Sequence, residues 1–148
     1  MALNMTGEYA LPLARKEVWK ALNDPDMLRR CIPGCESLEK LSDTEFFAVA
    51  RLEVGPVKAR FKGRVKLEDM IPPESYKIVG EGEGGVAGFA KGNAAVTLAE
   101  APEGTKLVYK AEATVGGKIA QLGQRLLAGT AKKIADRFFA NFAKALAE

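Results

Sequence analysis

A change in hydrophobic periodicity near residue 116 constrains the fold more than any other feature. From Ser37 to about Val115 apolar residues mostly recur at every second position, and turn residues interrupt the pattern at intervals. From Gly116 to Glu148 the period becomes helical, and one continuous stripe is formed by Leu127, Ala131, Ile134, Phe138 and Phe142. Period two is typical of strands with one covered face, and the 3.6-residue period is typical of an amphipathic helix. The chain is therefore predicted to form an antiparallel meander followed by a long terminal helix.

The first 33 residues complete the predicted architecture. Residues 3–11 alternate loosely and predict a strand with Leu3, Met5, Tyr9 and Leu11 on one side. Residues 14–22 predict a short helix, and a second one begins at Pro25 and ends before Pro33-Gly34. The fold class is α+β, with a curved antiparallel sheet of about six or seven strands around the C-terminal helix. A length of 148 residues fits one domain, residues 1–148.

Composition excludes several classes of function. The chain has no histidine, which rules out Ser-His-Asp, Cys-His and His-metal sites. Its net charge of +3 is too small for a protein that coats nucleic acid. The two cysteines, Cys31 and Cys35, are too few for a disulfide framework, and no run of about 18 apolar residues predicts a membrane span. We therefore predict no catalytic residue, no metal site and no nucleic-acid partner, and we expect a reducing compartment.

Turn positions fix a predicted register for the central strands. If Gly55-Pro56 closes a hairpin, four cross-strand pairs share one face: Val54 with Val57, Leu52 with Ala59, Ala50 with Phe61, and Phe46 with Val65. If Pro72-Pro73 closes the next turn, the face continues through Leu67 with Tyr76, Val65 with Ile78, Gly63 with Gly80, and Phe61 with Gly82. Later strands extend it with Ala90, Gly92, Ala94, Val96 and Leu98, then Leu107, Tyr109, Ala111, Ala113 and Val115. This face contains no charged residue.

Many positions on this face are alanine or glycine, whereas a filled core normally uses larger apolar side chains. Two interpretations follow: either the terminal helix approaches closely and fills the space, or an apolar cavity for a small molecule lies between sheet and helix. The candidate cavity wall contains residues from both elements. They are Phe46, Phe61, Val65, Ile78, Gly82, Ala90, Tyr109 and Ala111 from the strands, with Leu127, Ile134 and Phe138 from the helix.

Two basic surfaces are candidates for contact with a membrane or a protein partner. The first is a stripe of alternating cations on the opposite face of residues 57–67, namely Lys58, Arg60, Lys62, Arg64 and Lys66. It is either a solvated outer face or a landing site for anionic headgroups or an acidic protein. The second contains Lys118, Arg125 and Lys132, beside the apolar residues Ile119, Leu122 and Leu126. These apolar residues suit an interfacial helix, or they pack under a loop or in an oligomer contact.

Two motifs are not assigned a function. Residues 80–85 match G-x-G-x-x-G, but the mechanism of that motif requires a helix directly after the glycines, and residues 86–98 predict another strand. Cys31 and Cys35 are one residue further apart than in the redox C-x-x-C motif. We interpret the glycines as sites of strand bending or close approach, and the cysteines as packed thiols in a turn.

Specific segments resemble a known family. Val18-Trp19 followed by Leu22-Asn23-Asp24-Pro25, with the order of elements, resembles the START-like (SRPBCC) helix-grip superfamily. Residues 31–38, residues 85–92 and residues 121–127 leading into Phe138-Phe139 and Phe142 are similar to the CoxG family of carbon monoxide dehydrogenase. The resemblance spans nearly the whole chain.

The resemblance implies a non-enzymatic accessory protein of a molybdenum-containing carbon monoxide dehydrogenase or a related hydroxylase. It also implies membrane recruitment and the handling of an isoprenoid quinone or other lipid, with no covalent cofactor. The expected location is cytoplasmic, peripheral at the inner face of the cytoplasmic membrane. Two alternatives remain: an assembly or docking factor with a packed interior, and a cyclase- or hydrolase-type enzyme of the same superfamily.

Overall fold

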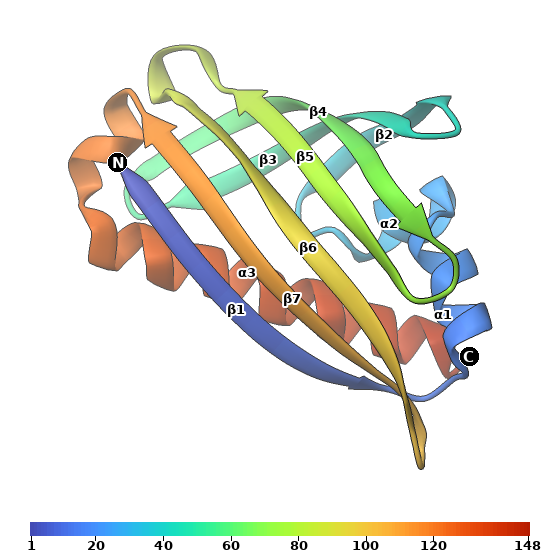
Figure 1. The fold of residues 1–148 in the computed structure, drawn as a ribbon. Helices are drawn as coiled ribbons and strands as arrows, with labels where there is room; N and C mark the ends of the chain where they lie inside the picture. The colour runs from blue at the N-terminus through green and yellow to red at the C-terminus, as the bar shows by residue number, and fades with distance from the viewer.

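The computed structural model describes residues 1–148 and contains one seven-stranded antiparallel sheet with helices on one side (Figure 1). In chain order the elements are β1 (Ala2–Leu11), α1 (Arg15–Leu22), α2 (Pro25–Cys31), β2 (Cys35–Ser42), β3 (Glu45–Val54), β4 (Val57–Ile71), β5 (Ser75–Glu83), the 3₁₀ turn η1 (Gly85–Ala87), β6 (Phe89–Ala101), β7 (Gly104–Gly116), the 3₁₀ turn η2 (Lys118–Leu122) and α3 (Gln124–Leu146). The sheet order is β1-β7-β6-β5-β4-β3-β2. The predicted α+β architecture is confirmed.

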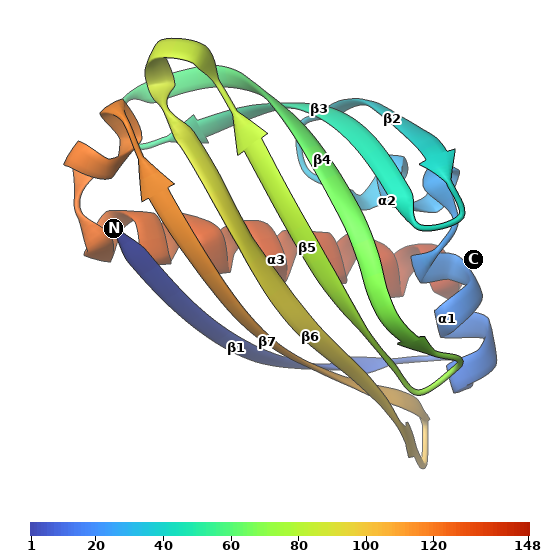
Figure 2. The same ribbon diagram turned by 45° about the horizontal axis from the view of Figure 1, so that its top comes forward.

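Helix α3 crosses the concave side of the strongly curved sheet (Figures 1 and 2). It packs mainly against β1 and α2, whereas its packing against the central strands is sparse. Helices α1 and α2 lie at the end of the sheet where α3 finishes, and the N-terminus, η1 and η2 lie at the opposite end (Figure 1). The molecule therefore has two distinct ends, one covered by three helices and one formed by turns.

The short helices form as the sequence predicts. Asp24 accepts a hydrogen bond from the backbone N–H of Asp26 and precedes Pro25, so α2 begins with a capped first turn. Cys31 ends α2 and Cys35 begins β2, and both thiols are free. Burial raises the pKa of each thiol, which favours the neutral, packed form.

The predicted register of the β3–β4 hairpin is confirmed at all four pairs, from Val54 opposite Val57 to Phe46 opposite Val65. The predicted β4–β5 register is wrong by two residues, because Leu67 lies opposite Ile78 and Val65 lies opposite Gly80. The predicted pairs do not match their own turn, because a two-residue Pro72-Pro73 loop would place Ile71 opposite Glu74 and Leu67 opposite Ile78, as observed for Leu67. In the structure the turn holds three residues, with Ile71 opposite Ser75, and an irregularity between Glu68 and Ile71, where Asp69 has a φ of 49°, adds one residue to β4. A shift of two preserves the side of the sheet, and the predicted inward face remains intact.

The terminal segment differs from the single helix predicted from residue 116. Gly123 has a φ of 96° and separates the 3₁₀ turn η2 from α3, which begins at Gln124. This positive φ is in the region that favours glycine, so the helical pattern in the sequence is interrupted by a conformational break. The predicted strand from Val86 is also delayed, because the single turn η1 precedes β6.

Two separate clusters of buried apolar residues hold sheet and helices together. The larger lies at the three-helix end and includes Val18, Leu107 and Phe142, each fully buried. The smaller lies at the turn end and includes Val54, Ile119 and Leu127. Each cluster buries side chains from both the sheet and the C-terminal segment, so α3 is anchored at both ends.

Candidate functional site

Between the two clusters, the concave face of the sheet is only partly covered. Each strand directs every second side chain to this face, and the rows between the clusters consist of alanine, glycine and a few larger residues. The half-buried members are Ala48, Gly63, Val65, Ile78, Gly80, Gly82, Ala90, Gly92, Ala94, Ala111 and Ala113. We call these positions the small-residue rows.

Large side chains facing this region retain solvent exposure. Phe61, Val65 and Ile78 on the strands are half-buried, although each points to the concave side. On α3, Ile134 and Phe138 are also half-buried, and Ile134 joins neither buried cluster. Apolar side chains clamped between a sheet and a helix are normally buried. The apolar side chains between the central strands and the middle of α3 are therefore incompletely covered.

Glycines on the concave face show that α3 stands away from the sheet there. An added methyl group at Gly63 would have only atoms of Glu81 and Gly82 within 4 Å, and one at Gly80 only atoms of Arg64 and Val65. All of these neighbours are in β4 and β5, and none is in α3. At these two positions the missing side chains are not replaced by the helix.

The predicted wall residues divide between the open region and the clusters. Phe46, Tyr109 and Leu127 are buried in the clusters, at 3%, 8% and 5% exposure. The other eight are half-buried: Phe61, Val65, Ile78, Gly82, Ala90, Ala111, Ile134 and Phe138. Six of these eight pack against a cluster: Val65, Ile78, Ala111 and Phe138 against the larger, and Phe61 and Ala90 against the smaller.

A polar link that the sequence did not predict fixes α3 to β1. The hydroxyl of Tyr9 donates a hydrogen bond to Oδ1 of Asp136 at 2.6 Å, and Nζ of Lys132 donates to Oδ2 at 2.8 Å. The Tyr9 ring also stacks on Phe139, with ring centroids 4.1 Å apart. The Lys132 and Tyr9 hydrogen bonds hold the pKa of Asp136 below its usual value, and burial, with the Asp136 bond, raises the pKa of Tyr9. No spacing in the sequence connects residues 9 and 136.

On the convex face, every cation of the predicted basic stripe lies near a carboxylate on another strand. The pairs are Lys58 with Glu53, Arg60 with Glu36, Lys62 with Glu83, Arg64 with Glu81, and Lys66 with Glu45. In the two ion pairs the nitrogen–oxygen distances are 2.6 Å for Arg60 and 3.8 Å for Lys58. Cross-strand carboxylates offset the positive charge, so the stripe resembles a solvated, mixed-charge surface.

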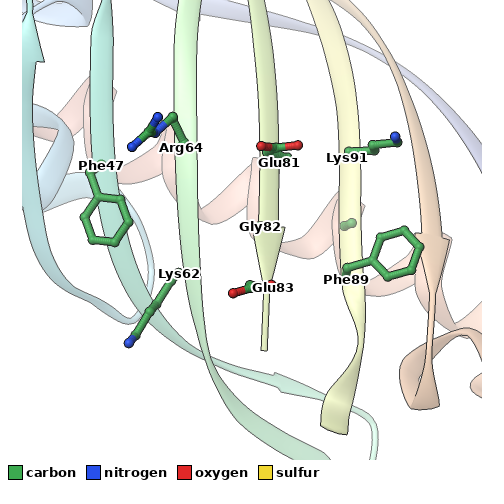
Figure 3. A pocket seen from close by; sticks show the side chains of 9 residues that line it. Phe47, Lys62, Arg64, Glu81, Gly82, Glu83, Phe89 and Lys91 are labelled. Carbon is green, nitrogen blue, oxygen red and sulfur yellow. The ribbon is translucent and has the colours of Figure 1, made fainter. Parts of the chain in front are cut away.

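A shallow groove of about 500 Å³ crosses this convex face (Figure 3). Figure 3 shows Arg64, Glu81 and Lys91 side by side on three strands, with Phe47 and Phe89 at the two sides. Charged groups of both signs dominate its lining. Burying them under an apolar molecule would cost their hydration, so this groove does not suit the apolar ligand predicted from the sequence.

The second basic surface is divided by the structure. Lys118 lies at the turn end beside η1, with which it lines a surface depression containing Val86 and Pro56. Arg125 begins α3 next to Leu126, whereas Lys132 is bound to Asp136 further along the helix. Val86 is 92% exposed and Leu126 is 39% exposed. The apolar tip at Val86 was missed because its sequence was interpreted as a strand.

Leu126 and Leu122 lie against the β3–β4 turn. A methyl group on Gly55 would approach Cδ2 of Leu126 to 3.3 Å and Cδ1 of Leu122 to 3.8 Å. Ile119, by contrast, is buried in the smaller cluster. We define the turn-end surface by Pro56, Val86, Lys118, Arg125 and Leu126. No helix of the structure has the length and apolarity needed to cross a bilayer.

Comparison with known proteins finds solved structures that are similar to this chain. A conserved protein from Geobacillus kaustophilus matches this chain with 37% identity and a TM-score of 0.92. The match covers 98% of this chain and 95% of that one. The Zhui aromatase/cyclase from a Streptomyces species matches with a TM-score of 0.71 at 10% identity, covering 99% of this chain and 94% of that one. Ara h 8.0201 matches with a TM-score of 0.67 at 16% identity, with 100% coverage of both chains. These two show the shared helix-grip fold alone.

A search of curated proteins gives no match. The family model for CoxG, described as a subunit of carbon monoxide dehydrogenase, matches residues 7–147, which is nearly the full length. Its span includes β2 to β7, η2 and all of α3, and therefore both walls of the partly covered region. The resemblance inferred from the sequence is thus confirmed: the chain belongs to the CoxG family of carbon monoxide dehydrogenase.

Proposed function

We propose that this protein is a non-enzymatic carrier that binds an isoprenoid quinone or another lipid between the sheet and α3. The observation that carries the proposal is the partial exposure of large apolar residues on both walls, Phe61 and Ile78 on the strands and Ile134 and Phe138 on the helix. Apolar surface left in water is unfavourable by about 25 cal/mol per Å². An apolar ligand seated there would remove that surface from water without displacing either buried cluster.

The family name supports a partner for this carrier. We infer that it serves a molybdenum-containing carbon monoxide dehydrogenase or a related hydroxylase, and links that enzyme to the membrane that holds the lipid. A carrier of this kind needs an apolar interior and a reversible surface contact, and both are consistent with the arrangement described above.

The turn-end surface is the best candidate for contact with anionic lipid. It combines the exposed apolar residues Val86 and Leu126 with the cations Lys118 and Arg125. Basic residues near an anionic membrane contribute about 1 kcal/mol each, and exposed apolar tips add burial in the interface. Because carboxylates offset the convex stripe, we assign membrane contact to the turn end and not to the stripe.

Ligand uptake is tested by extraction from a host that makes isoprenoid quinones. The protein is purified alongside Ala111→Trp, which places a large ring in the small-residue rows, and Lys110→Trp, which places the same ring on the convex face. Organic extracts are then analysed by mass spectrometry. We expect a stoichiometric quinone or lipid with the wild type and Lys110→Trp, and none with folded Ala111→Trp. Equal recovery from all three proteins, or none from any, would contradict the carrier proposal.

Membrane contact is tested by flotation with vesicles containing anionic lipid. Val86→Asp places a carboxylate at the turn end, and Val79→Asp places one at a site on the convex face that is 38% exposed. We expect the first variant to lose vesicle binding and the second to retain it. If both variants bind as well as the wild type, the turn end is not the membrane contact.

A further inference from the structure

Four hydroxyl groups lie on the concave face of the sheet, and three of them have polar neighbours within the protein. Tyr9 donates to Asp136, and Thr105 donates a 2.7 Å hydrogen bond to the carbonyl of Leu13. The Tyr109 hydroxyl lies near that of Tyr9 and contributes to its raised pKa. The fourth belongs to Tyr76 on β5, which makes no hydrogen bond within the protein.

Tyr76 is more than nine-tenths buried, with 6% of its surface exposed. A hydroxyl that is removed from water without a partner destabilises the fold, so such groups are rare unless they have another use. The only fully enclosed side-chain nitrogen or oxygen without a partner is Nε of Arg15, so the Tyr76 oxygen still touches accessible space. Since this side chain points to the concave side, the accessible space at its hydroxyl is on the side of the sheet that faces the helices (Figure 1).

Packing holds the Tyr76 ring in place. The ring meets Trp19 of α1 edge to face, with centroids 5.2 Å apart and planes at 82°. Val96, directly opposite on β6, is also buried. The hydroxyl is therefore preorganised, and a ligand would not have to order it on binding.

Tyr76 marks the inner limit of the open region. Its row continues across the sheet through Val96 to Tyr109, and all three are buried. The adjacent row toward the turn end is Ile78, Ala94 and Ala111, all half-buried, and the row on the other side leads into the larger buried cluster. A ligand that fills the small-residue rows would therefore meet the Tyr76 hydroxyl at its inner end.

We propose that the hydroxyl of Tyr76 is a polar subsite that donates a hydrogen bond to a carbonyl oxygen of the bound apolar molecule. This inference rests on the proposed carrier function and narrows it to apolar ligands whose head group carries a ketone or ester. The apolar tail extends along the small-residue rows toward the turn end. Burial raises the pKa of Tyr76, so this hydroxyl stays protonated and available as a donor.

The test compares two probes that differ in their carbonyl groups. Menadione is a naphthoquinone with two ketones, and 2-methylnaphthalene is its hydrocarbon counterpart. Equilibrium dialysis measures the affinity of each probe for the wild type, Tyr76→Phe and Tyr9→Phe. The last is the matched control, because the Tyr9 hydroxyl belongs to the link between β1 and α3. Thermal melting of every variant confirms that it is folded.

We expect Tyr76→Phe to lower the affinity for menadione about five-fold, the effect of losing one neutral hydrogen bond, and to leave the affinity for 2-methylnaphthalene unchanged. The control variant Tyr9→Phe should leave the ratio of the two affinities as in the wild type. If both probes bind and the ratio is the same in every variant, the subsite is refuted while the carrier function stands. If neither probe binds the wild type, the carrier function fails and the subsite fails with it.

Discussion

The central strands β5, β6 and β7 meet α3 in two different ways along their length. Beyond the row of Tyr76, Val96 and Tyr109, large side chains such as Leu107 and Phe142 close the space and are fully buried. On the other side of that row the inward strand residues are mostly alanine and glycine, and Ile134 and Phe138 on the same helix are only partly buried. One regular sheet and one helix thus provide a packed core and an open apolar wall, and side-chain size alone separates them.

The comparison predicts its largest effect for one pair of helix substitutions. Phe142→Ala removes a fully buried ring and should reduce the free energy of unfolding by about 3–5 kcal/mol. Phe138→Ala, one turn earlier, removes a ring that packs against Phe139 and Phe142 but is only partly buried, and should cost about 1–2 kcal/mol. Urea denaturation of both variants measures the difference. Equal losses would mean that the middle of α3 is packed as tightly as its end.

Glycines within the open region sharpen the comparison further. A methyl group at Gly92 would clash with the carbonyl oxygen of Glu112, only 2.1 Å away, so Gly92→Ala should destabilise the protein by about 1–3 kcal/mol. At Gly80 the nearest atoms would be 3.6 Å away, and Gly80→Ala should be neutral or stabilise by about 0.4–1 kcal/mol. Thermal unfolding distinguishes the two. A comparable loss at Gly80 would show that α3 or another element occupies the space above it.

The smallest expected effect concerns the link between α3 and β1. The pKa of Asp136 lies below its ordinary value of 3.8 because Lys132 and Tyr9 donate hydrogen bonds to it. The ionised group therefore contributes stability above about pH 3.8, and this contribution disappears as the pH falls through the lower pKa of the folded state. Asp136→Asn should be slightly less stable than the wild type at pH 7, and the gap should close below pH 3.8.

Denaturation curves at pH 7 and at acidic pH would measure that gap. Lys110→Gln, which removes a cation of the convex face at a position remote from this link, is the control and should show no such closure. A gap that stays constant on acidification would mean that the carboxylate of Asp136 contributes nothing to the docking of α3.

Much of the fold was predictable because period two assigns each strand residue to a face without regard to register. This is why Ala111 and Tyr109 were placed on the concave side, and why Gly55-Pro56 gave the correct β3–β4 pairing. The predicted β4–β5 pairs were two residues from the observed register, although a two-residue loop at Pro72-Pro73 gives the observed pair of Leu67 with Ile78; only the irregularity at Asp69 leaves no clear signal in the sequence. Even so, the two-residue shift kept Val65 and Ile78 on the predicted side.

The apolar character of the candidate site was predictable from the sequence, but the distance between the sheet and α3 was not. Alanine and glycine at inward positions indicated spare volume, but the distance between sheet and helix depends on how α3 is held at both ends. The Tyr9–Asp136 link joins residues 127 positions apart, and no local pattern connects them. Likewise, the unpartnered hydroxyl of Tyr76 could be identified only after its neighbours were known.

The central claim, that the open half of the sheet–helix interface is the ligand site, is tested most directly by methyl NMR of the isoleucines. The chain has five, at positions 32, 71, 78, 119 and 134. Ile78 and Ile134 face the open region from opposite walls. Ile119 is buried in the smaller cluster, and Ile71, at the far end of β4, is 55% exposed. Titration with menadione should shift the δ1 methyl signals of Ile78 and Ile134 in a saturable manner and leave Ile119 and Ile71 unmoved. Unchanged Ile78 and Ile134 signals, or shifts confined to Ile71, would contradict the account.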